Sequence, residues 1–180
     1  MARRISGPFQ QPGPDAGSLL RVCSYFSLIT YIAISYLSSN FRMALKVIEH
    51  GSRDYQKMVQ LRMDILRRPL GLQFTSDELQ HEKGDILIGA FEEEKILGCC
   101  MLIEKDKGVV RLRQMAVINN LQGKGIGRAM TLFAENIARD RGYKKITMHA
   151  RKPVVGFYEK LGYRVVGNEF LEITIPHFEM

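Results

Sequence analysis

The hydrophobic positions of this chain follow a regular pattern from Met43 onward. Alternation over residues 44–49 predicts a short strand, and apolar positions on one helical face predict a helix over 52–68, capped by Ser52. A second short helix should begin at Thr75, the first residue of a capping-box sequence. The regular part of the chain is therefore expected to start with one strand and two helices.

Three strand-like runs follow, separated by short turns that include charged residues. They cover residues 85–92, 95–104 and 109–117. Because such short joints connect neighbouring antiparallel strands, the three runs should form an antiparallel meander.

The second half of the chain alternates between helices and strands. An amphipathic helix is predicted over 125–141, a strand over 145–150, a helix over 153–161, and two closing strands over 163–166 and 170–175. The complete order is β-α-α-β-β-β-α-β-α-β-β. It predicts an α+β (mixed α/β) domain with a central mixed sheet of about six to seven strands, flanked by four helices.

Residues 1–42 form an N-terminal extension of different composition. Residues 1–18 are rich in Pro, Gly, Gln and Ser, which predicts disorder. Residues 22–41 carry no charge and include 13 apolar residues, which is long enough to cross a bilayer, but seven others are Ser, Thr or Asn. We expect the working domain to occupy residues 43–180, with the extension unfolded or foreign to the native protein. A membrane segment and an extra folded helix are the alternatives.

Positive charge is concentrated in one part of the chain. The net charge is +7, and residues 111–152 contain ten basic residues but only two acidic ones. This excess is typical of a region that meets an anion, although a solvated basic face has the same composition. The three cysteines are too few for a disulfide framework. Cys99 and Cys100 should pack on opposite faces of a strand, which fits a reducing, cytoplasmic compartment.

The basic segment contains a glycine-rich stretch, LQGKGIGRAM at 121–130, that leads directly into a predicted helix. Neither the P-loop spacing nor the dinucleotide-binding spacing fits it. A loop between a strand and a helix leaves N–H groups unpaired, and glycines let an anion approach them closely. Lys124 and Arg128 could add charged contacts. The pattern favours a diphosphate site, with a tight strand-to-helix turn as the structural alternative.

Two motifs resemble those of the GNAT acyltransferases. QGKGIG at 122–127 is similar to the family's Q/R-x-x-G-x-G/A coenzyme A signature, and GFYEKLGY at 156–163 is similar to its second motif. The segments RRPLGL at 67–72 and TIPH at 174–177 resemble the ElaA-like branch. The resemblance covers residues 44–180. It implies the GNAT fold and an N-acetyltransferase that uses acetyl-CoA as co-substrate and no metal.

The resemblance also implies which residues bind coenzyme A. Backbone groups of a strand would pair with the pantetheine arm, and amides of the loop would hold the pyrophosphate. These residues are Met115, Ala116 and Val117 in the strand, and Gln122, Gly123, Lys124, Gly125, Ile126, Gly127 and Arg128 in the loop. A ligand there requires the parallel strands 109–117 and 145–150 to splay apart. Arg151 stands where the family often has Asn, and it is a further candidate for a contact with the cofactor.

The implied reaction is direct attack of an amine on the thioester. Tyr158 occupies the family's general-acid position, where a phenol would protonate the leaving thiolate, and a core aromatic is the alternative role. The family often has a catalytic Glu on the strand that here reads RLRQ at 111–114, without an acidic residue. His177 is the first candidate for the general base, since by resemblance the closing strand lines the acceptor side. His149, Glu104 and a chain of waters are the other candidates.

The favoured function is acetyl-CoA-dependent acetylation of a primary amine on a small molecule or a peptide. A non-catalytic coenzyme A sensor or scaffold is the alternative. Nucleic acid is not expected as a partner, because no binding motif is present and the phosphates of coenzyme A account for the basic segment. A membrane partner is not expected either. The sequence allows a homodimer without fixing the oligomeric state, and it does not identify the acceptor.

Overall fold

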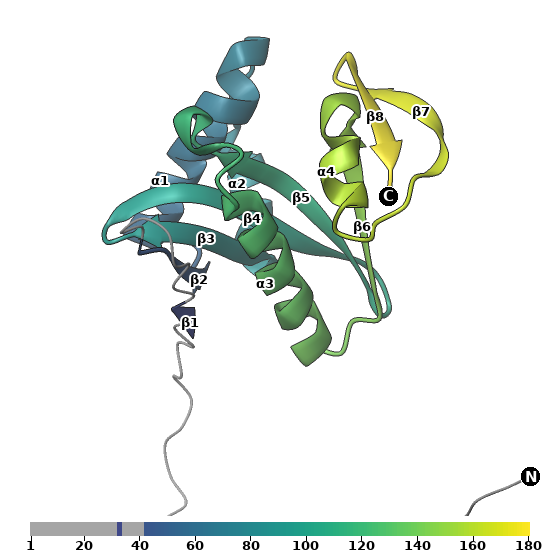
Figure 1. The fold of residues 1–180 in the computed structure, drawn as a ribbon. Helices are drawn as coiled ribbons and strands as arrows, with labels where there is room; N and C mark the ends of the chain where they lie inside the picture. Colours follow the sequence, from purple (N-terminus) through teal and green to yellow (C-terminus); the bar gives the residue numbers. More distant parts are fainter. Residues whose placement is uncertain (1–31, 34–41) are drawn as a thin grey trace, which may run out of the picture.

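A computed structural model describes residues 32–33 and 42–180 (Figure 1). Its sheet is mixed, with the strand order β1-β2-β3-β4-β5-β6-β8-β7. The strands are β1 Ile32–Ala33, β2 Ala44–Ile48, β3 Ile86–Glu92, β4 Lys95–Asp106, β5 Val109–Val117, β6 Lys145–Arg151, β7 Val166–Glu172 and β8 Ile175–Glu179. β1 is a two-residue pairing at the edge of β2, so the other seven strands carry the predicted sheet.

Four α-helices flank the sheet, as predicted. They are α1 Arg53–Arg62, α2 Ser76–His81, α3 Ile126–Asp140 and α4 Val155–Glu159. Ser52 caps α1 by accepting a hydrogen bond from the Tyr55 N–H at 3.1 Å. At α2, Thr75 and Glu78 form both bonds of the capping box. Both predicted helix starts are therefore confirmed.

The two faces of the sheet carry separate hydrophobic clusters. Strand residues and α3 build one cluster, which includes Cys100, and α4 joins it through Tyr158. The other cluster packs α1 on the opposite face and includes Cys99. Figure 1 shows α3 crossing one face of the strands that α1 and α2 cover from behind. Cys99 and Cys100 are free, buried and on opposite faces, as alternation along a strand predicts.

Strands β3 to β5 form the predicted antiparallel meander. β3 pairs with β4 and β4 with β5, each antiparallel. The two turns between them are short, and β5 has the predicted bounds, Val109–Val117. The central part of the sheet is thus built from neighbours in sequence, and the chain then crosses over through α3 to reach β6.

The closing strands are shifted from the predicted 163–166 and 170–175. The observed strands, β7 and β8, meet at a two-residue turn formed by Ile173 and Thr174, whose φ angles are 50° and 64°. A turn of this kind requires left-handed backbone at both central positions and usually contains Gly or Asn. The predicted strand bounds were wrong because Ile173 and Thr174 are β-branched, and such residues are typical of strands rather than of turns. β8 lies between β6 and β7.

The predicted N-terminal extension lies outside the described residues except for β1 and Arg42. Of the uncharged stretch 22–41, the structure describes only residues 32–33, which form β1. Over residues 32–33 and 42–180, no helix has both the length and the apolar character needed to cross a membrane.

Candidate active site

The sheet opens between β5 and β6. These strands pair in parallel over four residues each, and the last pair is Leu112 with Met148. From His149 onward β6 pairs with β8, while β5 continues to Val117 beside β4. Figure 1 shows β5 and β6 diverging from their shared end. The predicted splay is confirmed, and past Leu112 one edge of β5 has no strand partner among the described residues.

A β-bulge in β5 lies where this opening begins. The register leaves Gln114 and Met115 together opposite Cys100 of β4. Gln114 has φ 51°, which is uncommon for a residue other than glycine. After the bulge, Met115 packs with the α3 cluster and Ala116 with the α1 cluster. The strand predicted to pair with pantetheine thus starts at a bulge on the open edge.

The glycine loop connects the end of β5 to α3. Gly123 and Gly125 have φ angles of 77° and 85°, and Gly125 is the N-cap of α3, without a capping side chain. Within the part of the chain that the structure describes, the N–H groups of Gly125, Ile126 and Gly127 have no backbone acceptor. They lie at the positive end of the helix dipole, so the loop presents donors suited to an anion.

Gly127 serves a packing role that the sequence did not distinguish. Its φ is not positive, and a Cβ there would come within 3.3 Å of the Phe157 ring on α4. Close approach of α3 to α4 therefore favours a small residue here. The side chain of Gln122 ties the other end of the loop to β5 by donating to the Val117 carbonyl at 3.2 Å.

Tyr158 lies on α4, on the α3 side of the sheet. Its side chain is buried, and its ring packs edge-on against Phe157 with centroids 4.8 Å apart. Burial, with a smaller contribution from Cys100, raises the pKa of Tyr158 well above that of a free phenol. The hydroxyl therefore keeps its proton at neutral pH.

His149 lies on the face of the sheet opposite the α3 cluster, at the point of β6 where the opening begins. It is the first residue of β6 after the last pair with β5, and its neighbours Met148 and Ala150 belong to the α3 cluster. Alternation therefore turns His149 toward the opposite face. Its Nδ1 is 2.8 Å from Oε2 of Glu172 on β7, and its ring meets that of Phe170 edge-on at 4.8 Å.

His177 is near this pair but is differently bonded. It is 8% exposed, and its Nδ1 lies 2.8 Å from the carbonyl oxygen of Ile175 on its own strand. Its ring stacks on that of Phe170 with centroids 6.0 Å apart. His149 and His177 thus flank the same aromatic ring.

Two other residues that the sequence suggested for the site are Glu104, as a base, and Arg151, as a contact with the cofactor. Glu104 is exposed, pairs with Val110 near the start of β5 and accepts a hydrogen bond from the Tyr143 hydroxyl at 3.1 Å. Arg151 is half-buried at the end of β6, opposite His177 in the β6–β8 pair. Neither is brought next to Tyr158 by the strand register.

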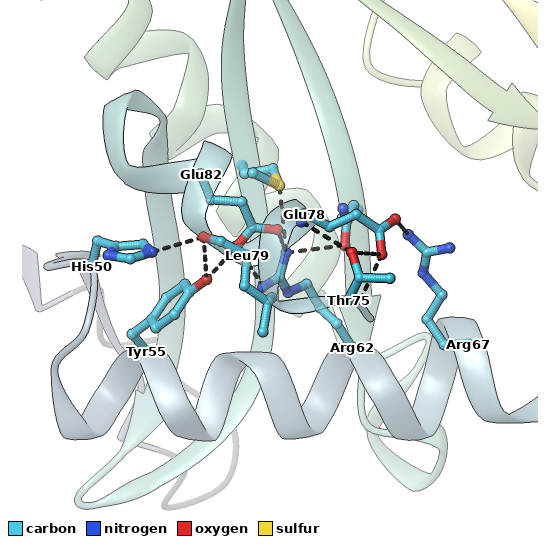
Figure 2. Close-up of polar contacts among 10 residues, drawn as sticks. His50, Tyr55, Arg62, Arg67, Thr75, Glu78, Leu79 and Glu82 are labelled. Atoms are coloured by element: carbon cyan, nitrogen blue, oxygen red, sulfur yellow. Dashed lines mark hydrogen bonds and ion pairs between the residues drawn. The ribbon is translucent and has the colours of Figure 1, made fainter. Parts of the chain in front are cut away.

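A buried charged network on the α1 side was not predicted from the sequence (Figure 2). Arg62 is fully buried and donates to both carboxylate oxygens of Glu82, at 2.7 and 2.8 Å. It also donates to Oε1 of Gln114 at 3.0 Å, and Tyr55 donates to Glu82 at 2.7 Å. Burial opposes the charge of Arg62, but its bonds to Glu82 raise its pKa above the usual value. The network thus ties α1 to the bulge at Gln114.

One signal in the sequence could have indicated this network. Tyr55, Met58 and Arg62 follow the spacing of one helical face, so the charged residue falls on the buried stripe of α1. A buried arginine needs a paired carboxylate. Glu82 and Gln114 are 20 and 52 residues away in sequence, however, and no local pattern links them to Arg62.

The basic segment 111–152 is divided among separate places in the fold. Lys124 and Arg128 are exposed beside the glycine loop. At the opposite end of α3, a hollow of about 310 Å³ is lined by residues that include Arg139, Lys144 and Lys145. It shares no residue with the glycine loop or with the β5–β6 opening. No three His, Cys, Asp or Glu side chains of the described residues gather as a metal site would require.

Residues 52–163 match the acetyltransferase (GNAT) family, and the chain belongs to that family. An uncharacterized N-acetyltransferase, YjcF of Bacillus subtilis, is 33% identical over 105 residues, which cover 58% of this chain and 73% of YjcF. Escherichia coli ElaA has the same fold with a TM-score of 0.64 at 16% identity, covering 76% of this chain and 97% of ElaA.

An aminoglycoside 6′-N-acetyltransferase in complex with coenzyme A also shares the fold. Its TM-score is 0.64 at 15% identity, and the match covers 75% of this chain and 93% of the neighbour. The predicted family, fold and class of enzyme are therefore confirmed: this is a GNAT acetyltransferase. ElaA, whose branch the sequence resembles, is among the matching folds.

Proposed function

We propose that this protein transfers the acetyl group of acetyl-CoA to a primary amine by direct attack on the thioester. The observation that carries the proposal is the opening between β5 and β6, which lies beside a glycine loop with unpaired amides at the start of α3. An extended ligand can pair with the open edge of β5 while its anionic end meets the loop. Acetyl-CoA has both parts.

The residues of the loop and of the open edge are suited to hold acetyl-CoA. Backbone groups of Met115, Ala116 and Val117 would bind the pantetheine arm, and the amides from Gln122 to Arg128 would bind the pyrophosphate. The exposed side chains of Lys124 and Arg128 add positive charge at that end. Arg151 is half-buried at the end of β6 and is a further candidate contact.

Tyr158 would act as the general acid. When the amine nitrogen attacks the carbonyl carbon, the C–N bond forms and the C–S bond breaks, and the phenol gives its proton to the departing sulfur. The raised pKa of Tyr158 keeps that proton in place at neutral pH. The attacking amine gives up a proton in the same step, so the site also needs a base, for which His177 was the first candidate in the sequence.

The acceptor is proposed to be a small-molecule or peptide amine, and the compartment the cytoplasm. The buried thiols of Cys99 and Cys100 are free, as a reducing compartment permits. We do not propose a nucleic-acid partner, because the basic residues of 111–152 are distributed over separate parts of the fold.

The test is an acetyl-transfer assay on the full chain. Acetyl-CoA is incubated with a panel of primary amines, such as 1,4-diaminobutane, 2-phenylethylamine and a lysine-containing peptide, and free thiol and acetylated amine are both measured. We expect thiol release to equal amine acetylation. Tight binding of acetyl-CoA without turnover on any amine, and without hydrolysis, would instead indicate a coenzyme A sensor.

A further inference from the structure

The pairing of His149 with Glu172 leaves one nitrogen of the histidine available. A carboxylate can only accept, so the contact of 2.8 Å requires a proton on Nδ1 of His149. In the neutral ring the lone pair is then on Nε2. Among the described residues, no hydrogen-bond partner contacts Nε2, and the side chain of His149 is 25% exposed. The ring is thus held at one nitrogen and open at the other.

Glu172 is ionised in this setting. Burial alone would raise the pKa of its carboxyl group, but the hydrogen bond from His149 and the nearby positive groups, including Arg113, lower it below its usual value. The ring is also held by its edge-on contact with Phe170. A charged carboxylate and an aromatic wall therefore fix both the tautomer and the orientation of His149.

His149 lies where the β5–β6 opening begins. His149 follows Met148, the last β6 residue paired with β5, and projects from the face opposite Tyr158. A thioester placed in the opening would have the phenol on one side and the imidazole on the other. Arg111, Arg113 and Thr147 share the face of His149 on the paired strands, and Glu179 lies opposite it on β8. None of Arg111, Arg113 and Thr147 can take a proton. The carboxylate of Glu179 is engaged by Arg111 at 3.9 Å.

We propose that His149 is the general base of the acetyl transfer and that Glu172 is its positioning residue. This proposal rests on the proposed function. Nε2 of His149 takes a proton from the attacking amine nitrogen as the C–N bond forms. The C–S bond breaks, and the sulfur takes a proton from Tyr158. Solvent then carries a proton from the imidazolium to the phenolate, so the products are the acetamide and coenzyme A.

His177 is less suited to this role. Its side chain is almost fully buried, and its Nδ1 is engaged by the Ile175 carbonyl of its own strand. Its ring supports Phe170, which in turn packs on His149. The geometry therefore shifts the assignment of the base from His177 to His149.

The proposal is tested with His149→Ala, His149→Gln and Glu172→Gln in the full chain. The matched control is Glu169→Gln, which removes a carboxylate of the same strand that is paired with Lys152 at 2.7 Å. Turnover is measured with the amine panel and, without amine, as hydrolysis of acetyl-CoA. Acetyl-CoA affinity is measured by calorimetry, and melting temperature reports folding.

We expect both His149 variants to lose about 100-fold or more in kcat while acetyl-CoA affinity stays within about twofold. Added imidazole should restore part of the turnover of His149→Ala, which a merely structural loss would not allow. Glu172→Gln can still accept the Nδ1 hydrogen bond but lacks the charge, so kcat should fall about tenfold. Glu169→Gln should match the wild type.

Three results would overturn the proposal, and they do so in two different ways. Wild-type turnover in the folded His149→Gln variant, or no response of His149→Ala to imidazole, removes His149 as the base while the proposed function stands. A wild-type protein that neither acetylates any probe amine nor hydrolyses acetyl-CoA overturns the proposed function, and this inference with it.

Discussion

The network around Arg62 and the pair of His149 with Glu172 both join a basic side chain to a glutamate beside the central strands. They differ in what is left unbonded. Both terminal nitrogens of Arg62 are bonded and the residue is fully buried, although its Nε has no partner among the described residues. His149 keeps a free nitrogen and is partly exposed. The first arrangement can stabilise the fold, and only the second can exchange a proton with a ligand.

The same contrast separates the regions around the two pairs. The α1 side fixes the bulge from behind through the bond from Arg62 to Gln114. On the other side, the amides at the start of α3, the Tyr158 hydroxyl and Nε2 of His149 have no hydrogen-bond partner among the described residues. Substitutions in the first region should therefore lower stability, and those in the second should lower binding or turnover.

The largest effect is expected from Glu82→Ala. This substitution leaves the buried guanidinium of Arg62 without its carboxylate, and breaking a buried ion pair in this way costs about 3–5 kcal/mol. Urea unfolding would measure the loss. Glu172→Gln, on the partly exposed pair, should lower the free energy of unfolding much less. Equal losses of unfolding free energy in Glu82→Ala and Glu172→Gln would contradict the distinction between a structural pair and a functional pair.

Gly125→Val should weaken acetyl-CoA binding by about tenfold or more, which corresponds to about 1.4 kcal/mol. A β-branched residue resists the φ of 85° and obstructs the approach of a phosphate to the loop amides. Gly142→Val is the control, since Gly142 has φ 84° at the other end of α3. Both variants should lose stability through strain of about 1–3 kcal/mol, but only Gly125→Val should lose affinity in calorimetry. Undiminished affinity would remove the loop from the ligand site.

A smaller effect should appear in the acid dependence of stability. The pKa of Glu172 is lowered in the folded protein, so its contribution is present above the unfolded pKa and is lost as pH falls through the folded value. The difference in unfolding free energy between wild type and Glu172→Gln should therefore shrink below about pH 4. Urea titrations at several pH values test this, and a difference that grows on acidification would contradict the pairing.

The smallest effect is expected from removing residues 1–42. The regular pattern starts at Met43, and of the removed residues the structure places only β1 in the sheet, as a two-residue pair at the edge of β2. A chain starting at Met43 should be soluble and bind acetyl-CoA as the full chain does. Loss of folding would show that the extension belongs to the core.

Local patterns in the sequence predicted most of the fold. The caps at Ser52 and Thr75, the meander and the bounds of β5 follow from side-chain spacing and short turns. The closing hairpin was misplaced because Ile173 and Thr174 adopt positive φ without the usual turn residues. That shift depends on how β7 and β8 pair, which periodicity alone does not determine.

In the candidate site too, local motifs could be predicted from the sequence and tertiary pairings could not. The glycine loop and Tyr158 are contiguous motifs and were visible in the sequence. His149 was a candidate, but its partner Glu172 is 23 residues away and becomes its neighbour only through the strand order β6-β8-β7. Pairings that depend on tertiary contacts, like those of Arg62, could not be predicted from one sequence.

Acetyl transfer in the opening between β5 and β6 is tested most directly by the kinetics of Tyr158→Phe. The substitution keeps the ring packed against Phe157 and removes only the hydroxyl. We expect acetyl-CoA affinity and melting temperature to stay unchanged while kcat falls at least about tenfold, as loss of a general acid requires. Because burial raises the pKa of Tyr158, the wild-type rate should not yet decline at the ordinary phenol value near pH 10. Wild-type turnover in Tyr158→Phe, with acetyl-CoA still bound, would contradict the assignment of Tyr158 as the acid.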